Sequence, residues 1–178
     1  MSIVGQLLHT GIKYAPKKSL IKQNPKQKQI NVLHQLLKYA QHTAFGKRYD
    51  FKDLIRLKDP RSEFKKWIPV YHYEEMYIEW WQRSRQDEPD LAWPGITPYY
   101  GISSGSTQSS SKYIPVTQES LNGWSKTAQK LFTSLAAYPE ITAALLSKQS
   151  LMVGGSSHLI REGLHFYSDN SGIIAICQ

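Results

Sequence analysis

The serine-rich stretch SSGSTQSSSK, residues 103–112, constrains this chain more than any other segment. By composition alone, such a stretch is more typical of a flexible linker than of a ligand site. The residues before it, LAWPGITPYYG, carry two prolines and two glycines and predict an extended, irregular segment. After it, Thr117 is a candidate helix N-cap with Glu119 in the first turn. The apolar face of that predicted helix comprises Leu121, Trp124, Ala128, Leu131, Phe132 and Leu135. Because the stretch lies between two ordered elements, we favour a ligand-binding loop over a linker.

This serine-rich loop (residues 103–112) carries the groups that hold a polyphosphate. Small side chains let backbone N–H groups point inward, hydroxyls add donors, and an ammonium adds a compact positive charge. The candidate binding residues are Ser103, Ser104, Gly105, Ser106, Thr107 and Lys112. Their spacing does not fit GxxxxGK[ST], so the sequence excludes a Walker-type loop.

Helical periodicity predicts two helices near the N-terminus. The apolar residues Ile3, Val4, Leu7, Leu8 and Ile12 predict an amphipathic helix over residues 2–14. A second helix is predicted to start at Asn24-Pro25, because Asn can cap and Pro suits the first helical position. Its apolar stripe comprises Ile30, Leu33, Leu37 and Ala40. We expect this helix to end near Phe45-Gly46.

Short strands are predicted near residues 99–103, 150–154 and 164–167, which makes the fold class α/β. Residues 60–82 are rich in aromatic side chains, and Pro69 interrupts them before an acidic helical turn at Glu74 and Glu75. These aromatic residues are Phe64, Trp67, Tyr71, Tyr73, Tyr77, Trp80 and Trp81. Core packing is the favoured role for them, and the lining of an acyl pocket is the alternative. Arg83 to Asp90 is predicted to be a loop.

Composition favours one globular domain, since 40% of the 178 residues are hydrophobic and 12% are aromatic. No apolar run approaches the ~20 residues that span a bilayer, so we expect no membrane segment. The single cysteine, Cys177, allows neither an internal disulfide nor a cysteine-based metal site. These features predict a cytoplasmic protein.

The positive charge of the chain is concentrated at its N-terminal end. Residues 1–49 form a basic segment, predicted to be helical, with nine Lys and Arg and no Asp or Glu, whereas the whole chain has a net charge of +8. Clustered lysines can bind nucleic acid or anionic lipid, but solvated helix faces have the same composition. We favour the solvated face, because the segment lacks the interleaved aromatics and arginines typical of nucleic-acid surfaces.

No histidine or acidic pair in the sequence indicates catalysis or a metal site. His34, His42, His72, His158 and His165 lack metal-ligand spacing such as HExxH, so surface or core roles are favoured. Glu74 and Glu75 are adjacent and would diverge on a helix. Asp169 lies in the turn-forming segment SDNSG, where its side chain can bond its own backbone. We therefore assign no catalytic residue and no metal site.

The run from Trp93 to Thr117, WPGITPYYGISSGSTQSSSKYIPVT, resembles the GH3 pattern of WPG, SSGTTxGxxK and a hydrophobic-Pro-x-Thr. Upstream, residues 43–47 resemble the T-x-FGK segment of that family, and Phe64, Pro69, Tyr73 and Glu74 match its spaced F, P and YE signature. Downstream, residues 153–157 and Ser171-Gly172-Ile173 resemble a strand-to-glycine segment and a GDLS[AG]I-like stretch. The resemblance extends from about residue 40 onward.

Membership in this family implies an ATP-dependent acyl-acid amide synthetase. A carboxylate attacks the α-phosphate of ATP, pyrophosphate leaves, and an amino acid captures the acyl-adenylate as an amide. The resemblance implies that the serine-rich loop holds the β- and γ-phosphates, within a phosphate-loop region covering residues 93–117, and that Mg²⁺ accompanies the ATP. Ser106 stands where Thr is usual and keeps the hydroxyl, whereas Ser109 stands where Gly is usual and adds a Cβ.

Family members are considerably longer than this chain. The resemblance implies that the adenine-contacting motif, the ribose-binding acid and the mobile catalytic domain lie outside these 178 residues. We therefore expect residues 1–178 to be a partial N-terminal domain, with an incomplete sheet from an adenylate-forming, acyl-CoA synthetase-like large domain. Such a fragment is expected to be inactive alone and to form homo-oligomers through exposed apolar surface. The alternative is a non-catalytic binding module that uses its basic N-terminal surface.

Overall fold

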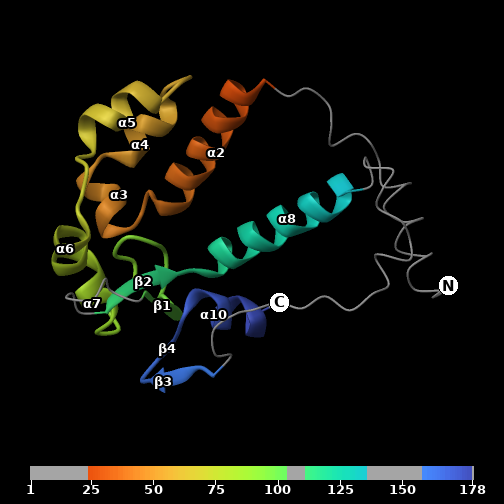
Figure 1. Ribbon diagram of the computed structural model, residues 1–178. Coiled ribbons are helices and arrows are strands. Elements are labelled where there is room, and N and C mark those ends of the chain that lie inside the picture. The colour runs from red at the N-terminus through yellow and green to blue at the C-terminus, as the bar shows by residue number, and fades with distance from the viewer. Residues whose placement is uncertain (1–23, 104–110, 136–157, 178) are drawn as a thin grey trace.

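The computed structural model describes residues 24–103, 111–135 and 158–177. The helices of the first half are α2 (Pro25–Ala40), α3 (Ala44–Arg48), α4 (Phe51–Arg56), α5 (Arg61–Trp67), α6 (Tyr73–Met76), the π-helical η2 (Tyr77–Trp81) and α7 (Gln82–Ser84). The remaining elements are β1 (Tyr99–Ser103), β2 (Lys112–Val116), α8 (Gln118–Leu135), β3 (Ile160–Glu162), β4 (His165–Ser168) and α10 (Asn170–Cys177). Helices α2 to α5 lie at one end of the molecule and the sheet lies at the other (Figure 1).

The four described strands form one mixed sheet with the order β2-β1-β4-β3. Strand β1 pairs antiparallel with β2 and parallel with β4, while β3 pairs antiparallel with β4. Because β1 and β4 are parallel, their carboxyl ends lie at the same edge of the sheet. The two predicted strands that the structure describes, at 99–103 and 164–167, thus pair within the chain, and the expectation that they await partners from outside it is wrong.

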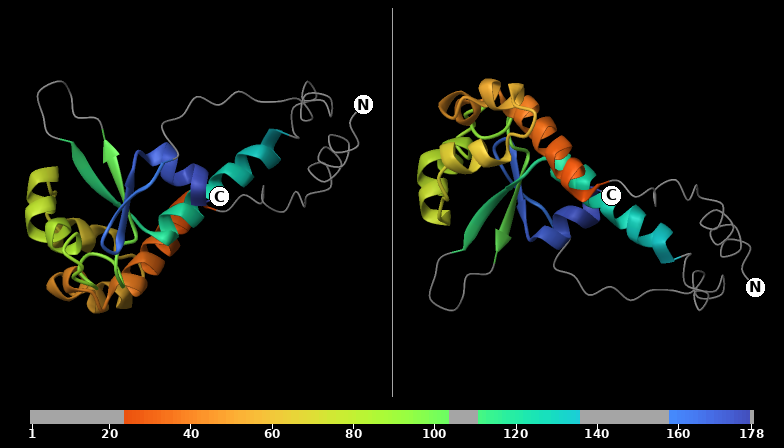
Figure 2. Two further views of the ribbon diagram at one scale, coloured as in Figure 1. Left: turned by 90° about the horizontal axis from the view of Figure 1, so that it is seen from below. Right: turned by 90° about the horizontal axis from the view of Figure 1, so that it is seen from above.

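Helices cover both faces of this sheet. The stretch α6–η2–α7 lies on one side and α10 on the other (Figure 2). On the first side, the fully buried Tyr100 donates a hydrogen bond from its hydroxyl to Ser84 Oγ of α7, at 2.8 Å. On the second, a Cβ at Gly101 would lie 2.1 Å from Oδ1 of Asn170 at the start of α10. Glycine at position 101 therefore allows α10 to approach β1 closely.

A separate apolar cluster holds the helical end together. Its buried members are Leu37 and Ala40 of α2 and Phe51 and Leu54 of α4. Phe45 packs against this cluster and contacts Phe51 and Trp80 edge-on, with ring centroids 5.9 and 5.1 Å apart. Leu37 and Ala40 lie on the stripe that the sequence predicts for the second helix, and Phe45 lies on the T-x-FGK segment.

The predicted start of the second helix is confirmed, but its predicted end is wrong. Asn24 Oδ1 accepts a hydrogen bond from Lys26 N at 3.0 Å, as expected for a cap. The helix ends at Ala40 because Thr43 closes it, donating from Oγ1 to Ala40 O at 2.7 Å. The same Oγ1 accepts from Gly46 N at 3.0 Å and so caps the next helix, α3.

The other predicted elements agree with the structure to different degrees. The strand at 99–103 and the acidic helical turn at residues 74 and 75 are confirmed, and Thr117 caps α8 by accepting from Ser120 N at 3.2 Å. The strand predicted at 164–167 begins and ends one residue later. The predicted loop from Arg83 is wrong at its start, because α7 continues through Ser84. The helix predicted over 2–14 and the strand near 150–154 lie outside the described residues. In the described part, no helix has the length and apolar character needed to cross a membrane.

Candidate functional site

The two ends of the serine-rich loop are held by a β-hairpin. Ser103 is the last residue of β1, Lys112 is the first residue of β2, and the two form the terminal pair of the antiparallel register. Ser104, Gly105, Ser106 and Thr107 lie outside the described residues. Of the six candidate residues, the structure thus describes the two at the base of the loop and brings them opposite each other.

This hairpin lies beside the carboxyl end of a parallel neighbour. Gly101 of β1 is in register with Ser168, the last residue of β4, and α10 begins directly afterwards. Asp169 Oδ1 accepts from Gly172 N at 2.8 Å and from Ser171 Oγ at 2.5 Å, which caps that helix. The expectation of turn chemistry at Asp169 is therefore confirmed. In open α/β sheets, ligands bind outside the carboxyl ends of neighbouring parallel strands.

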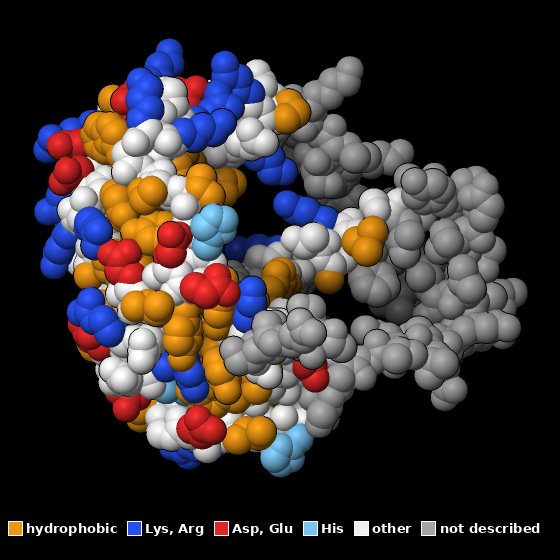
Figure 3. Space-filling model, turned by 60° about the vertical axis from the view of Figure 1, so that its left-hand side comes forward, with side chains coloured by type: hydrophobic (Ala, Val, Ile, Leu, Met, Phe, Trp, Pro, Cys, Tyr) orange, Lys and Arg blue, Asp and Glu red, His pale blue; other side chains and the backbone are white. Residues whose placement is uncertain are grey.

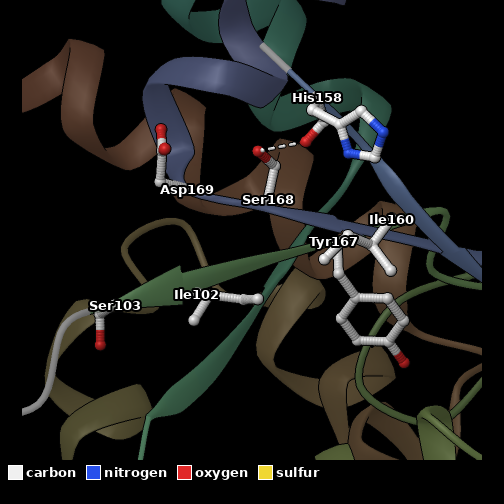
Figure 4. A pocket seen from close by; sticks show the side chains of 7 residues that line it. All are labelled: Ile102, Ser103, His158, Ile160, Tyr167, Ser168 and Asp169. Atoms are coloured by element: carbon white, nitrogen blue, oxygen red, sulfur yellow. Dashed lines mark hydrogen bonds between the residues drawn. The ribbon is translucent and has the colours of Figure 1, made fainter. Parts of the chain in front are cut away.

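A pocket of about 620 Å³ lies at this edge of the sheet. Its apolar lining comes from Ile102 of β1, Ile160 of β3 and Tyr167 of β4, and its polar lining from Ser103, His158, Ser168 and Asp169. The close view shows these side chains gathered where β1 and β4 end, with Ser103 at the start of the loop (Figure 4). Ser168 donates a hydrogen bond from Oγ to His158 O at 3.1 Å, which fixes one side of the pocket. Sequence patterns did not single out Ile102 or Ile160.

Lys112 lies against the YE signature of α6. Its Nζ is 4.8 Å from the centroid of the Tyr73 ring and 3.8 Å from Glu74 Oε1. The backbone N–H of Tyr113 donates to the Tyr73 hydroxyl at 2.8 Å. The two signature residues therefore contact the arm of the hairpin that leaves the serine-rich loop.

Arg85, which follows α7 in the predicted loop, contacts Tyr167 of the pocket lining and two further tyrosines. Its guanidinium lies 3.8 Å above the Tyr113 ring and donates from Nη1 to the Tyr77 hydroxyl at 2.7 Å. From Nε it donates to the hydroxyl of Tyr167, whose side chain lines the pocket, at 3.3 Å. Burial acts to lower the pKa of Arg85, but the phenol hydrogen bonds outweigh it and the pKa is raised. The cation therefore ties α7 to β2 and β4.

The tryptophan of the WPG motif joins α2 to α8. Trp93 Nε1 and the Tyr39 hydroxyl each donate to one oxygen of Glu119, both at 2.9 Å, and the two rings stack with centroids 5.3 Å apart. The glycine of the motif, Gly95, has φ +76° and donates from its N–H to Asp90 Oδ1 at 2.7 Å. This Trp93–Glu119–Tyr39 clamp therefore anchors the WPG turn to α2 and α8 just before β1 begins.

The T-x-FGK segment binds the chain just before that turn. Ala44 N donates to Asp90 O at 2.7 Å, and Phe45 N donates to Leu91 O at 2.9 Å. The segment at residues 43–47 is thus connected to the segment at 93–95 through residues 90–91, whereas residues 73–74 contact the hairpin directly. Of these segments, only residues 73–74 contact the base of the serine-rich loop, because Trp93 binds Glu119 beyond the opposite end of the hairpin.

The histidines do not form a metal centre among the described residues, where no group of three His, Cys, Asp or Glu could hold a metal ion. His165 is buried, with Nδ1 2.7 Å from Thr97 O and Nε2 3.1 Å from Asp87 Oδ1. His42, His72 and His158 are exposed. His165 thus has the predicted core role and His42, His72 and His158 have the predicted surface role, whereas His34 is half-buried.

These observations define an α/β domain in which Ser103, at the base of the serine-rich loop, lines a pocket at the carboxyl ends of two parallel strands. The sequence model for the GH3 family N-terminal domain matches residues 17–169. The chain belongs to the GH3 family, as its motifs predict. No curated protein and no solved structure gives a significant match.

Proposed function

We propose that this chain is the ATP-handling N-terminal portion of an acyl-acid amido synthetase, within an adenylate-forming, acyl-CoA synthetase-like large domain. In the proposed reaction, a carboxylate displaces pyrophosphate from ATP and an amino acid then captures the acyl-adenylate. The observation that carries the proposal is the Ser103–Lys112 register pair, which holds the base of the loop beside the pocket. Family membership supports the same assignment.

The loop residues would bind the phosphates that leave. Hydroxyls of Ser103, Ser104, Ser106 and Thr107, backbone N–H groups around Gly105 and the Lys112 ammonium would offset the charge that develops on pyrophosphate. Mg²⁺ usually keeps several waters and few protein ligands, and it binds mainly to phosphate oxygens. Asp169 is the carboxylate in the pocket lining, but its Oδ1 already caps α10, so such an ion would be held mainly by phosphate oxygens and water.

The pocket has the size and lining expected for a small carboxylic acid. Ligand pockets commonly measure about 300–1,000 Å³ and combine an apolar wall with a few polar groups. Here the side chains of Ile102, Ile160 and Tyr167 would contact the hydrocarbon part of the acid. Ser103, where the loop begins, belongs to the polar lining, so we place the meeting of the carboxylate and the α-phosphate on its side of the pocket.

Calorimetric titration of the 178-residue chain with MgATP tests this proposal. We expect weak binding that Lys112→Ala reduces, because a hydrogen bond to a charged group is worth about 1.5–3 kcal/mol, or roughly 10- to 150-fold in Kd. Lys52→Ala, which removes an exposed lysine of α4, is the matched control and should leave the affinity unchanged. Equal affinities for ATP in the wild type and in Lys112→Ala would contradict the assignment.

Turnover is expected to be undetectable in pyrophosphate exchange with ATP, Mg²⁺ and a panel of carboxylic acids. The reason is that the resemblance assigns the adenine and ribose contacts and the closing domain to parts of the enzyme outside these residues, so positioning and water exclusion would be lost. Clear exchange by the purified chain would contradict this part of the proposal.

A basic binding surface is the second candidate function. Residues 24–67 contain 11 Lys and Arg against 4 Asp and Glu. In the space-filling view, blue side chains gather at the end of the molecule that carries α2, α4 and α5 (Figure 3). Three of the acids are paired locally, Asp53 with Arg56, Asp59 with Arg61 and Glu63 with Lys66. A module of this kind would prefer long nucleic acid over ATP and would lose affinity steeply with salt.

A further inference from the structure

The first two residues of α6 form a seat for Lys112. The ammonium lies over the face of the Tyr73 ring at 4.8 Å, and Glu74 Oε1 is 3.8 Å away. The next residue of the strand, Tyr113, donates its N–H to the Tyr73 hydroxyl. One residue of α6 thus holds both the side chain of Lys112 and the backbone that follows it.

Contacts within α6 and with η2 fix the position of this seat. Glu75 Oε2 accepts from His72 N at 2.8 Å, which fixes the start of α6. The Tyr73 ring stacks on Tyr77, with centroids 5.7 Å apart, and meets Trp81 edge-on at 5.9 Å. Because the ring is packed on two sides, its remaining face presents one fixed position to a cation.

Glu74 differs from Tyr73 in how firmly it holds the lysine. The Glu74 side chain is 71% exposed and that of Lys112 is 39% exposed, at a separation of 3.8 Å. An exposed pair of this kind changes an equilibrium by only about two- to fivefold. A polyphosphate, which carries several negative charges and can accept hydrogen bonds from the ammonium, would outcompete a single carboxylate.

We propose that Tyr73 and Glu74 are positioning residues for Lys112. Tyr73 sets the location of the ammonium at the base of the serine-rich loop. Glu74 pairs with that ammonium until a polyphosphate displaces the Glu74 carboxylate. This inference rests on the proposed function, since it assigns the YE signature to the same phosphate site. It also predicts opposite effects of the two residues on the affinity for phosphate: Tyr73 increases this affinity, whereas Glu74 lowers it by competing for the Lys112 ammonium.

The first test observes Lys112 directly and does not depend on ATP. In protein labelled with ¹³C-lysine, the Cε–Hε signal of Lys112 is identified by its loss in Lys112→Arg. The face of the Tyr73 ring should shift this signal upfield. Tyr73→Leu should abolish the shift, while Tyr73→Phe, which keeps the ring, should preserve it. An unmoved Lys112 signal in Tyr73→Leu would overturn the inference.

The second test measures the affinity for MgATP and for inorganic pyrophosphate. Glu74→Gln should tighten binding about two- to fivefold, because it removes the competing carboxylate. Glu75→Gln is the matched control: it removes the same charge from the same helical turn, and its amide oxygen can still accept from His72 N. Tyr73→Leu should weaken the binding of both ligands, whereas Tyr73→Phe should keep most of the wild-type affinity.

The two tests separate this inference from the proposed function. Equal effects of Glu74→Gln and Glu75→Gln on affinity would overturn the competing role of Glu74, because a general charge effect would then explain both. If neither ATP nor pyrophosphate binds while the Lys112 signal follows the Tyr73 variants, the proposed function fails and the positioning of Lys112 by Tyr73 is supported.

Discussion

Gly46 illustrates how a single position can determine the path of the chain between two helices. A Cβ built there would lie 2.0 Å from Ala40 O and 2.9 Å from Ala40 C, both backbone atoms that cannot rotate away. The neighbouring Thr43 hydroxyl bonds both Ala40 O and Gly46 N, so the two helices are drawn together at this point. The glycine of the T-x-FGK segment is therefore required by close packing.

Substituting Gly46→Ala should destabilise the protein by roughly 1–3 kcal/mol, because the backbone of Ala40 must shift. Urea denaturation measures this difference. Gly123→Ala is the control, since nothing lies within 4 Å of its added Cβ in α8, and it should stabilise the protein by roughly 0.5–1 kcal/mol. If Gly46→Ala is as stable as the wild type, the contact between α2 and α3 is looser than described.

At the level of single residues, the sequence predicted the caps well and the partners poorly. Asn24 and Thr117 cap helices because their side-chain oxygens bond to backbone groups close in sequence. Arg85 does lie just after a helix, in the charged stretch predicted as a loop, but its contacts with Tyr113 and Tyr167 were not predicted, because these partners are distant in sequence. Hydrogen bonds between residues close in sequence can be predicted from a local pattern. Contacts between residues distant in sequence can be identified only once the fold is known.

At the level of elements, the Trp93–Glu119–Tyr39 clamp is the main polar connection described between α2 and α8. Burial of the Glu119 carboxyl acts to raise its pKa, but hydrogen bonds from Trp93, its own backbone, Tyr39 and Thr117 outweigh burial. The pKa is therefore lowered from its ordinary value of 4.5. The stabilising contribution is present above pH 4.5 and is lost as the pH falls through the lowered pKa.

Glu119→Gln should destabilise the protein at pH 7 by less than about 1 kcal/mol, because Glu119 is an exposed residue whose carboxylate is only slightly removed from solvent. The difference from the wild type should shrink as the pH falls below 4.5, since the wild-type carboxyl then becomes neutral as well. Urea midpoints at several pH values measure this change. Trp93→Phe, which removes one donor, should also flatten the pH dependence. Curves for Glu119→Gln and the wild type that run parallel at every pH would contradict the clamp.

The strands reveal where pattern analysis is limited. Strand β1 was predicted with its observed bounds, because aromatic and β-branched residues follow a Pro-Gly segment. Strand β2 was hidden because its first residue, Lys112, was assigned to the loop, and its Pro115 is atypical of a strand interior. Strand β3 has only three residues, all exposed, and so carries no hydrophobic alternation. Both were missed because pairing with β1 and β4 defines them, rather than their own composition.

At the level of the whole molecule, α2 leaves apolar surface uncovered. Val32 and Leu36 are 47% and 48% exposed, and together with Pro25, Lys28, Gln29 and Leu33 they line a hollow of about 460 Å³. On α8, Leu131 is 64% exposed. Contiguous apolar surface of this kind favours association between proteins.

We therefore expect the isolated chain to self-associate, and Leu36→Lys to reduce the association. Sedimentation velocity over a range of protein concentrations measures the change. Val70→Lys is the control, because Val70 is 91% exposed but lies in the segment between α5 and α6, away from this face of α2. A stable monomer at all concentrations in the wild type would contradict the prediction.

The sheet topology also orders the events of folding. The hairpin of β1 and β2 joins segments that are close in sequence, whereas the parallel pairing of Tyr99 with Phe166 must close a loop that includes the whole of α8. Closing a long loop costs more entropy than closing a short one, and parallel pairing between distant segments slows folding. The base of the serine-rich loop can thus form early, while the pocket cannot exist until β4 reaches β1. During synthesis from the N-terminus, the chain would present the arms of its loop before it has any cavity to which a carboxylic acid could bind.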